Sequence, residues 1–185
     1  MIVAFDASVL VYVLDANARP PLDPQTGQPV SRCSDRVKAL IEQLQRDDAK
    51  VIIPTPSLAE VLVKAQAAAP EWLRILNASR QFRISSFDQR AAVEFAATQA
   101  ARLGSRAAGV PRQKAKFDDQ IVAIAIVEGA EVIYSDDEHI RQLLAGSRIR
   151  VIGIGDLPLP VEDAQRPLPL PDPDPANRPE DWGRF

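Results

Sequence analysis

The sequence contains a single cysteine, Cys33, and a single histidine, His139. One thiol cannot form an intramolecular disulfide, and this pair cannot supply the four ligands of a structural zinc site. The same scarcity excludes multi-histidine metal centres and most catalytic triads and dyads that depend on histidine or cysteine. Any chemistry that this chain performs must therefore use carboxylate, hydroxyl or lysine groups.

Long apolar runs are also missing. The apolar start MIVAFDASVLVYVL is interrupted by Asp6 and has no basic flank, so we expect no signal peptide. The longest strongly apolar run elsewhere, Ile121 to Val127, is too short to cross a bilayer. We therefore expect no membrane segment and a soluble cytoplasmic protein, and a lone thiol is consistent with a reducing compartment.

Charge and proline divide the chain into two unequal parts. A length of 185 residues predicts one domain. Residues 158–185 hold eight of the sixteen prolines and six acids against three arginines, whereas residues 1–157 hold 19 acids and 19 bases. The prediction is a domain over 1–157 and a Pro-rich acidic tail over 158–185, extended or disordered, because prolines cannot continue a helix or sheet. Trp182 and Phe185 in the tail either dock on a surface or are incidental.

Within the body, short β-branched runs alternate with helical segments, which predicts α/β architecture with a mostly parallel sheet. We expect strands at Ile2 to Phe5, Lys50 to Ile53, Phe82 to Ser85, Val132 to Tyr134 and Arg150 to Ile152. Helices are expected at about 8–14, 35–46, 70–79, 88–103, 117–128 and 137–145, with another that begins at Thr55 as its N-cap. The helix at 117–128 is apolar almost all round, so it should be buried.

Acidic residues follow the ends of several predicted strands. They are Asp6 after the first strand, Glu60 after the second, Asp118 and Asp119 at the start of the buried helix, and Asp136 and Asp137 after the fourth strand. Because the carboxyl ends of parallel strands share one edge of a sheet, these acids can converge there. Such a cluster needs protons or cations to neutralise it, and Mg²⁺ or Mn²⁺ prefers oxygen ligands. The pattern suggests metal-dependent phosphoryl transfer or phosphodiester hydrolysis.

Each acid also has a structural explanation. Asp6 could cap a helix, and Ser57 with Glu60 and Ser135 with Glu138 match the capping-box spacing. Acids such as Asp118 are common in first helical turns because of the helix dipole. Capping does not explain why an acid adjoins a strongly apolar buried helix, so the acids taken together favour a site.

Three segments resemble the motifs of PIN-domain nucleases. VAFDASVLVYVLD is similar to the family's opening motif, TPSLAEVL to its glutamate-bearing motif, and KFDDQIVAIAIVEGAEVIYSDDEHI to its D-x-x-I-x-A-x-A helix with the strand and Ser-x-Asp turn that follow. The resemblance covers residues 1 to about 153 and is greatest to VapC-type toxins of bacterial toxin–antitoxin pairs. The Pro-rich loop at 19–31 and the acidic tail depart from the family pattern.

The resemblance implies a three-layer α/β/α fold and an Mg²⁺- or Mn²⁺-dependent endoribonuclease with an RNA substrate, a cognate antitoxin and a homodimeric state. It implies that Asp6, Glu60, Asp118 and Asp137 hold the metal, with Asp6 and Asp118 touching it directly. It gives supporting roles to Ser8, Ser135, Asp119 and Asp136, and the role of Asp136 stays open. His139 is expected to be a surface residue of a helix. Hydrolysis would use a metal-bound water as nucleophile.

A basic stretch leads into Asp118. From Phe95 to Phe117 there is no acid, while Arg112, Lys114 and Lys116 come directly before the predicted site, so they are candidate phosphate contacts. The alternative is a merely solubilising basic run. Two other functions stay open: a PIN nuclease of RNA maturation without an antitoxin, and a PIN-like scaffold that binds without cutting.

Overall fold

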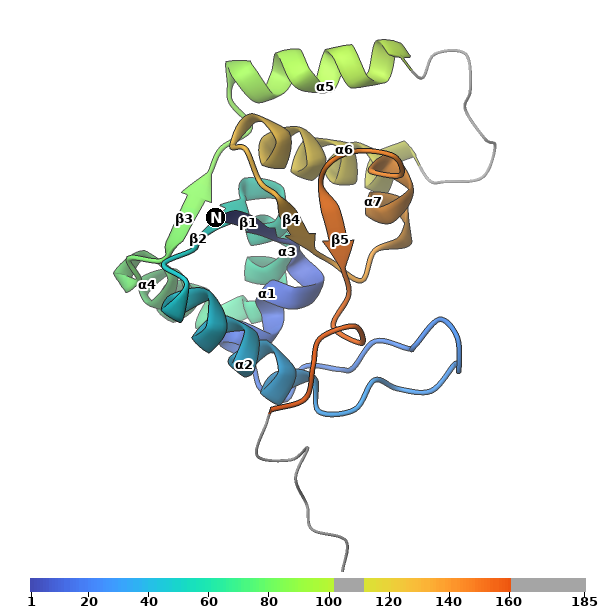
Figure 1. Cartoon of the computed structure of the whole chain (residues 1–185). Coiled ribbons are helices and arrows are strands. Elements are labelled where there is room, and N and C mark those ends of the chain that lie inside the picture. The colour runs from blue at the N-terminus through green and yellow to red at the C-terminus, as the bar shows by residue number, and fades with distance from the viewer. Residues whose placement is uncertain (102–111, 161–185) are drawn as a thin grey trace, which may run out of the picture.

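The computed structural model in Figure 1 is described here for residues 1–101 and 112–160, with side chains from residue 116 onward in the second range. Within these ranges no helix is long and apolar enough to cross a membrane. The division predicted at residue 157 stays a prediction, and most of the predicted tail, 161–185, lies outside the described residues.

A five-stranded, all-parallel sheet forms the centre of the protein, with the strand order β3-β2-β1-β4-β5. The strands are β1 (Ile2–Phe5), β2 (Lys50–Pro54), β3 (Phe82–Ser85), β4 (Val132–Tyr134) and β5 (Arg150–Ile152). The chain runs from β1 outward to β2 and β3, and then returns to place β4 and β5 on the other side of β1. The predicted parallel sheet is confirmed, and β1 lies at its middle.

Seven α-helices and one short 3₁₀ helix are described. They are α1 (Ala7–Leu14), α2 (Cys33–Arg46), α3 (Thr55–Ala65), η1 (Gln66–Ala68), α4 (Ala69–Ala78), α5 (Gln89–Ala101), α6 (Arg112–Val127) and α7 (Glu138–Leu143). The prediction that Thr55 caps α3 is wrong. Pro54 occupies the N-cap position and Thr55 is already helical, with no side-chain cap. Pro56 still lies in the first turn, where its missing N–H costs no helical hydrogen bond.

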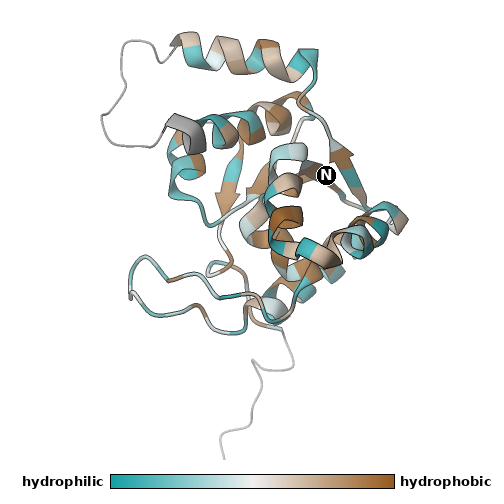
Figure 2. Cartoon of the chain, turned by 180° about the vertical axis from the view of Figure 1, so that it is seen from behind, coloured by the Kyte–Doolittle hydropathy of each residue, from teal (hydrophilic) through white to brown (hydrophobic). Residues whose placement is uncertain are grey.

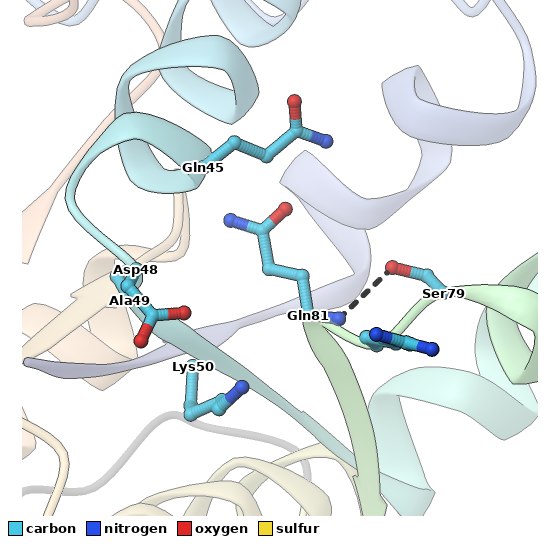
Figure 3. Close-up of a pocket in the computed structure, with 7 residues that line it drawn as sticks. Gln45, Asp48, Ala49, Lys50, Ser79 and Gln81 are labelled. Atoms are coloured by element: carbon cyan, nitrogen blue, oxygen red, sulfur yellow. Dashed lines mark hydrogen bonds between the residues drawn. The ribbon is translucent and has the colours of Figure 1, made fainter.

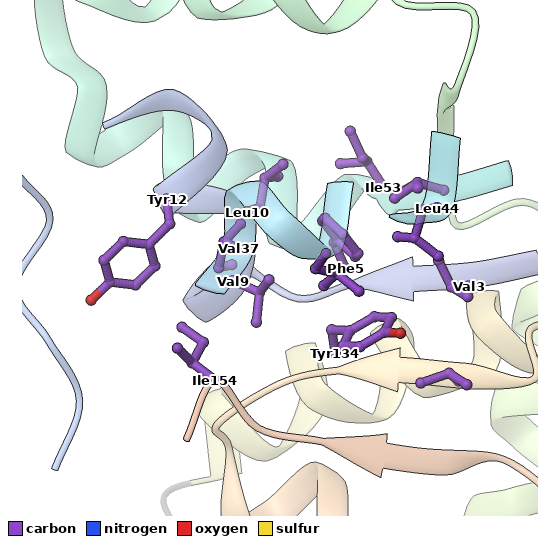
Figure 4. Packing of buried hydrophobic residues seen from close by; sticks show 14 of the residues in the cluster. Val3, Phe5, Val9, Leu10, Tyr12, Val37, Leu44, Ile53, Tyr134 and Ile154 are labelled. Atoms are coloured by element: carbon purple, nitrogen blue, oxygen red, sulfur yellow. The ribbon is translucent and has the colours of Figure 1, made fainter. Parts of the chain in front are cut away.

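The sheet separates two hydrophobic clusters because side chains alternate along each strand. Val3 and Phe5 point into the cluster formed with α1 to α4, shown in Figure 4, whereas Ala4 packs with α5, α6 and α7 on the opposite face. The rings of Phe5 and Tyr134 are nearly perpendicular, at 82°, with their centroids 5.5 Å apart, and this contact ties β1 to β4 within the first cluster. The predicted three-layer α/β/α fold is confirmed.

Helix α6 is the most deeply buried helix segment of the second cluster. The five residues Ile121–Ala125 are each at most 2% exposed. Figure 2 shows the strands of the sheet mostly in brown, the colour of hydrophobic residues. The predicted burial is confirmed for 121–125 of the segment IVAIAIV, whereas Ile126 and Val127 are half-buried. The buried part fixes Asp118 one turn before the core.

The Pro-rich loop between α1 and α2 is anchored to the domain at both of its ends. The Tyr12 hydroxyl donates to the Arg19 carbonyl at 2.7 Å, and the Cys33 thiol donates to the Val30 carbonyl at 3.2 Å. Burial is the main cause that raises the pKa of both the Tyr12 hydroxyl and the Cys33 thiol. Cys33 is therefore a structural thiol in this fold.

Candidate functional site

Asp6 lies where the order of the strands reverses, at the carboxyl end of the central strand. Strand β1 ends at Phe5, and the chain that follows β4 begins at Ser135 on the neighbouring strand. In open parallel sheets this position forms the crevice where ligands bind. The Asp6 side chain is only 6% exposed, so its carboxylate is largely removed from bulk water.

Three serine hydroxyls surround the Asp6 carboxylate, and we call them the hydroxyl clamp. Ser8 and Ser135 donate to Oδ2 at 3.1 and 2.9 Å, and Ser57 donates to Oδ1 at 3.3 Å. Among the described residues Asp6 forms no ion pair. Neutral donors stabilise a buried carboxylate but do not cancel its charge. The clamp therefore holds a negative charge in place and leaves it available to a cation.

The geometry of these serines shows that the capping explanations fail. Asp6 occupies the N-cap position of α1, yet its side chain makes no capping hydrogen bond. Ser57 is the third residue of α3, not its cap, and Ser135 precedes Asp137, which is the actual cap of α7. Ser57 and Ser135 instead each donate to Asp6, from different segments of the chain. Ser135 Oγ also accepts from the Asp137 N–H at 3.0 Å, but neither serine is the N-cap of the helix beside it.

Asp136 borders the clamp and links it to the chain after β5. Its backbone N–H donates to the Ser8 hydroxyl at 3.1 Å, and its Oδ1 accepts from the Ile154 N–H at 2.8 Å. Its Oδ2 is buried and has no hydrogen-bond partner in the described part of the chain. Burial is the main cause that raises the pKa of this carboxyl, and the nearby charges of Asp6 and Asp156 add to the effect.

The two acids at the start of the buried part of α6 differ in their surroundings. Asp118 is buried, at 4% exposure, and its role at the site stays a prediction. Asp119 is half-buried and accepts a hydrogen bond from the Gln99 side chain of α5 at 2.6 Å. This hydrogen bond of Asp119 therefore links α6 to α5.

Glu60 and Asp137 lie closer to solvent. Glu60 is exposed on α3, a helix that packs against α6. Asp137 is half-buried and accepts from the His139 N–H at 2.7 Å, which caps α7. Contrary to the expectation of a surface residue, His139 is half-buried, and its Nε2 is buried without a hydrogen-bond partner in the described ranges.

The donor set at Asp6 fits a hard divalent cation. Buried carboxylate and hydroxyl oxygens are the ligands that Mg²⁺ and Mn²⁺ prefer, and the clamp supplies no competing cation. Among the described residues, however, no group of three or more acidic, cysteine or histidine side chains is close enough to form a complete metal site. The structure thus brings Asp6, Ser8 and Ser135 together, whereas the convergence of all four acids stays a prediction.

The basic residues predicted to contact phosphate are only partly described. The side chains of Arg112 and Lys114 lie outside the described set, although both residues belong to the first turn of α6. Lys116 is exposed on the same helix. A phosphate-binding role for these residues stays a prediction.

A pocket lies away from Asp6, near the beginnings of β2 and β3. Its volume is about 240 Å³. Gln45, Lys50, Ser79 and Gln81 are among the residues that line it, as Figure 3 shows. The Gln81 N–H donates to the Ser79 hydroxyl at 3.2 Å. This pocket lies at the amino ends of the strands, whereas Asp6 lies at the carboxyl end of β1, so the two are in different parts of the molecule.

Ser57 is the member of the clamp that the sequence analysis did not single out as a site residue. Its side chain is fully buried, and it reaches Asp6 from α3. The sequence does contain a signal for Ser57, because this serine lies three residues before Glu60 in TPSLAEVL. That spacing was interpreted only as a capping box.

The sequence model of the PIN domain matches residues 32–144, more than half of the chain. The chain belongs to the PIN-domain family. The match includes Glu60, Asp118 and Asp137, and Asp6 precedes it. No protein of curated function shows significant sequence similarity to this PIN chain.

Solved structures of VapC-containing complexes share the fold. The VapBC2 complex of Rickettsia felis bound to a promoter DNA fragment aligns with a TM-score of 0.54 at 15% identity, over 83% of this chain and 98% of the other. DNA-bound VapBC of Salmonella typhimurium aligns with a TM-score of 0.52 at 15% identity, over 83% and 98%. A Mycobacterium tuberculosis VapC that cleaves the sarcin–ricin loop aligns with a TM-score of 0.50 at 14% identity, over 76% and 93%.

Proposed function

We propose that this PIN-domain protein is a Mg²⁺- or Mn²⁺-dependent endoribonuclease and the toxin of a type II toxin–antitoxin pair. The observation that carries the proposal is the buried Asp6 carboxylate, held at the switch point of the sheet by three neutral hydroxyls. A fold needs no such arrangement for packing, because a buried charge without a counter-charge is unfavourable. The family relationship supplies the chemistry that would make use of it.

Four acids would hold the metal in this proposal: Asp6, Glu60, Asp118 and Asp137. When bound, the metal would supply Lewis acidity and an activated water for attack on a phosphodiester. Asp6 and Asp118 are the buried members of this set, so their negative charges would be the ones that most need neutralisation by the metal. Ser8, Ser57 and Ser135 would keep the Asp6 carboxylate in one orientation, and Asp136 would hold Ser8 in place through its backbone N–H. Exposed Lys116 would contact the RNA backbone.

The proposed partners follow from the proteins that share the fold. The R. felis and S. typhimurium neighbours are complexes with an antitoxin, which supports an antitoxin partner for this chain. The M. tuberculosis neighbour is a toxin that cleaves the sarcin–ricin loop, which supports RNA as the substrate class. A homodimer is the expected assembly by the same family reasoning.

The test is cleavage of a mixed RNA pool by the purified full chain with Mg²⁺ or Mn²⁺, with and without EDTA. We expect cleavage by the wild type and its loss with chelator, in Asp6→Asn and in Asp118→Asn. The control Asp35→Asn removes a surface carboxylate that pairs with Arg32 at 2.8 Å, and it should leave cleavage unchanged. Calorimetric titration with Mn²⁺ supplies a second readout that does not depend on knowing the RNA target.

Three results would decide against parts of the proposal. Cleavage that persists in EDTA would exclude the metal. Equal metal affinity of Asp6→Asn and the wild type would show that the metal binds somewhere other than the hydroxyl clamp. A wild type that neither binds metal nor cuts RNA would favour the binding scaffold.

A further inference from the structure

The face of the sheet that carries α1 to α4 is not covered uniformly. Helix α2 runs beside β4 and β5, and a groove of about 880 Å³ lies between them. One wall is the outward side of α2, which includes Arg36 and Arg46, and the other is formed by Arg150 and Ile152 of β5. On the opposite face α6 and α7 pack over the same strands. The residues that line this groove include neither Asp6 nor a serine of the hydroxyl clamp.

The chain itself enters one end of this groove. Residues 156–160 line it, and Arg36 holds them there by donating to the carbonyls of Leu157 and Gly155. Leu157 is buried, whereas Leu159 is 40% exposed at the groove. The described chain therefore reaches Pro160 as part of the groove lining, and Figure 1 shows this segment crossing to α2.

The charges along the groove are not balanced within the described residues. Lys38, Arg46 and Arg150 line it and form no ion pair in the described part of the chain. Two of its four acids are already engaged, because Asp35 pairs with Arg32 and Asp156 lies 3.8 Å from Arg141. The other two acids are Glu42 and Asp47. A segment that carries acids close to Pro160 would complement the basic side chains.

The sequence after Pro160 has this composition. It begins VEDAQRP, with Glu162 and Asp163 first, and the 25 residues from Val161 to Phe185 hold six acids and three arginines. A helix of 14 residues such as α2 is about 21 Å long. An extended chain advances about 3.3 Å per residue, so roughly six to seven residues would be enough to follow the whole groove.

We propose that residues 161–167 lie along this groove, between α2 and β5, and that the acidic, Pro-rich end of the chain docks on its own domain. The occupant is this segment of the same molecule, since the chain is already held at the entrance by Arg36 and needs no second binding event. Docking there would brace β5 and Tyr134, which directly precedes Ser135 of the hydroxyl clamp. The proposal does not depend on the nuclease function.

Photo-cross-linking in the full chain tests the proposal. The variant Gln43→p-benzoylphenylalanine places the probe on the groove side of α2. The matched control is Gln45→p-benzoylphenylalanine, two residues along the same exposed helix, where the side chain lines the other pocket. We expect mass spectrometry to find an intramolecular cross-link from position 43 to peptides of 161–185, and at most a small fraction of that yield from position 45.

A second variant tests the charge argument. Combining Arg46→Glu with Arg150→Glu should lower the cross-link yield from position 43 about two- to fivefold, the range expected for lost exposed ion pairs. An unchanged yield would contradict the complementarity on which the proposal rests. Cross-links between two copies, equal yields from positions 43 and 45, or no cross-link to 161–185 would each overturn it.

Discussion

The hydroxyl clamp makes a quantitative prediction for Ser57→Ala. The Ser57 side chain is fully buried, and alanine nearly preserves its volume, so the substitution mainly deletes the 3.3 Å hydrogen bond to Asp6 Oδ1. Hydrogen bonds to charged groups contribute about 1.5–3 kcal/mol, and a bond of this length belongs at the lower end. We expect a loss of about 1.5 kcal/mol in the free energy of unfolding.

Urea denaturation in EDTA measures this loss as a decrease of roughly 0.5–1 M in the midpoint, with an unchanged slope. The control is Ser86→Ala, because Ser86 is exposed and its hydroxyl makes no hydrogen bond among the described residues; it should stay within about 0.5 kcal/mol of the wild type. In an Asp6→Asn background, Ser57→Ala should cost about 0.5–1 kcal/mol, because the acceptor is no longer charged. Equal costs of Ser57→Ala in the two backgrounds, or a cost no larger than that of Ser86→Ala, would refute the clamp.

Three further predictions address other contacts. A Cβ at Gly153 would lie 2.9 Å from Asp136 Oδ1, whereas one at Gly155 would lie 3.6 Å from the Val30 side chain. Thermal unfolding should therefore show that Gly153→Ala destabilises the protein by about 1 kcal/mol more than Gly155→Ala does. Equal effects of the two substitutions would contradict the close approach at Gly153. Burial alone would raise the pKa of Glu128, but hydrogen bonds from Ser85 and Arg83 outweigh it and lower the pKa below 4.5. This bonding stabilises the fold above the unfolded-state pKa and is lost as the pH falls through the folded-state pKa. Glu128→Gln should therefore cost about 1 kcal/mol at pH 7 and progressively less below pH 4.5 in denaturation curves, and a pH-independent cost would argue against the linkage. Mg²⁺ at 100 times its dissociation constant should stabilise the wild type by about 2.7 kcal/mol and Asp6→Asn far less, as seen in melting temperatures; equal shifts would place the ion elsewhere.

Much of the fold could be predicted because local patterns and tertiary packing agree. Strands β1, β3, β4 and β5 have the predicted limits, since each is a short apolar run between clear breaks. The burial of Ile121–Ala125 followed from an apolar segment with no polar face. The start of α3 was misjudged because Thr55 and Pro54 both suit a helix boundary, and only the path of the chain out of β2 decides between them.

The site was harder to predict than the fold. The position of Asp6 follows from strand order, which the alternating pattern indicates. The contact of Ser57 with Asp6 depends on the rotation of α3 about its axis, which the sequence does not show. The three-residue spacing of Ser57 and Glu60 is also that of a capping box, so it could not distinguish the two roles. The half-burial of His139 likewise depends on how the short helix α7 packs, which its own sequence does not specify.

The strand order has a consequence for biosynthesis. Asp6 is translated before the three serines of its clamp, Ser8, Ser57 and Ser135, and the last of these follows β4. A nascent chain that stops before β4 carries the acid without a partner strand on that side, and the pairing of β1 with β4 joins residues far apart in the chain, a class of contact that forms late. Synthesis must therefore run through the whole segment from Asp6 to Ser135 before the site around Asp6 can exist, so translation itself delays the appearance of the assembled site.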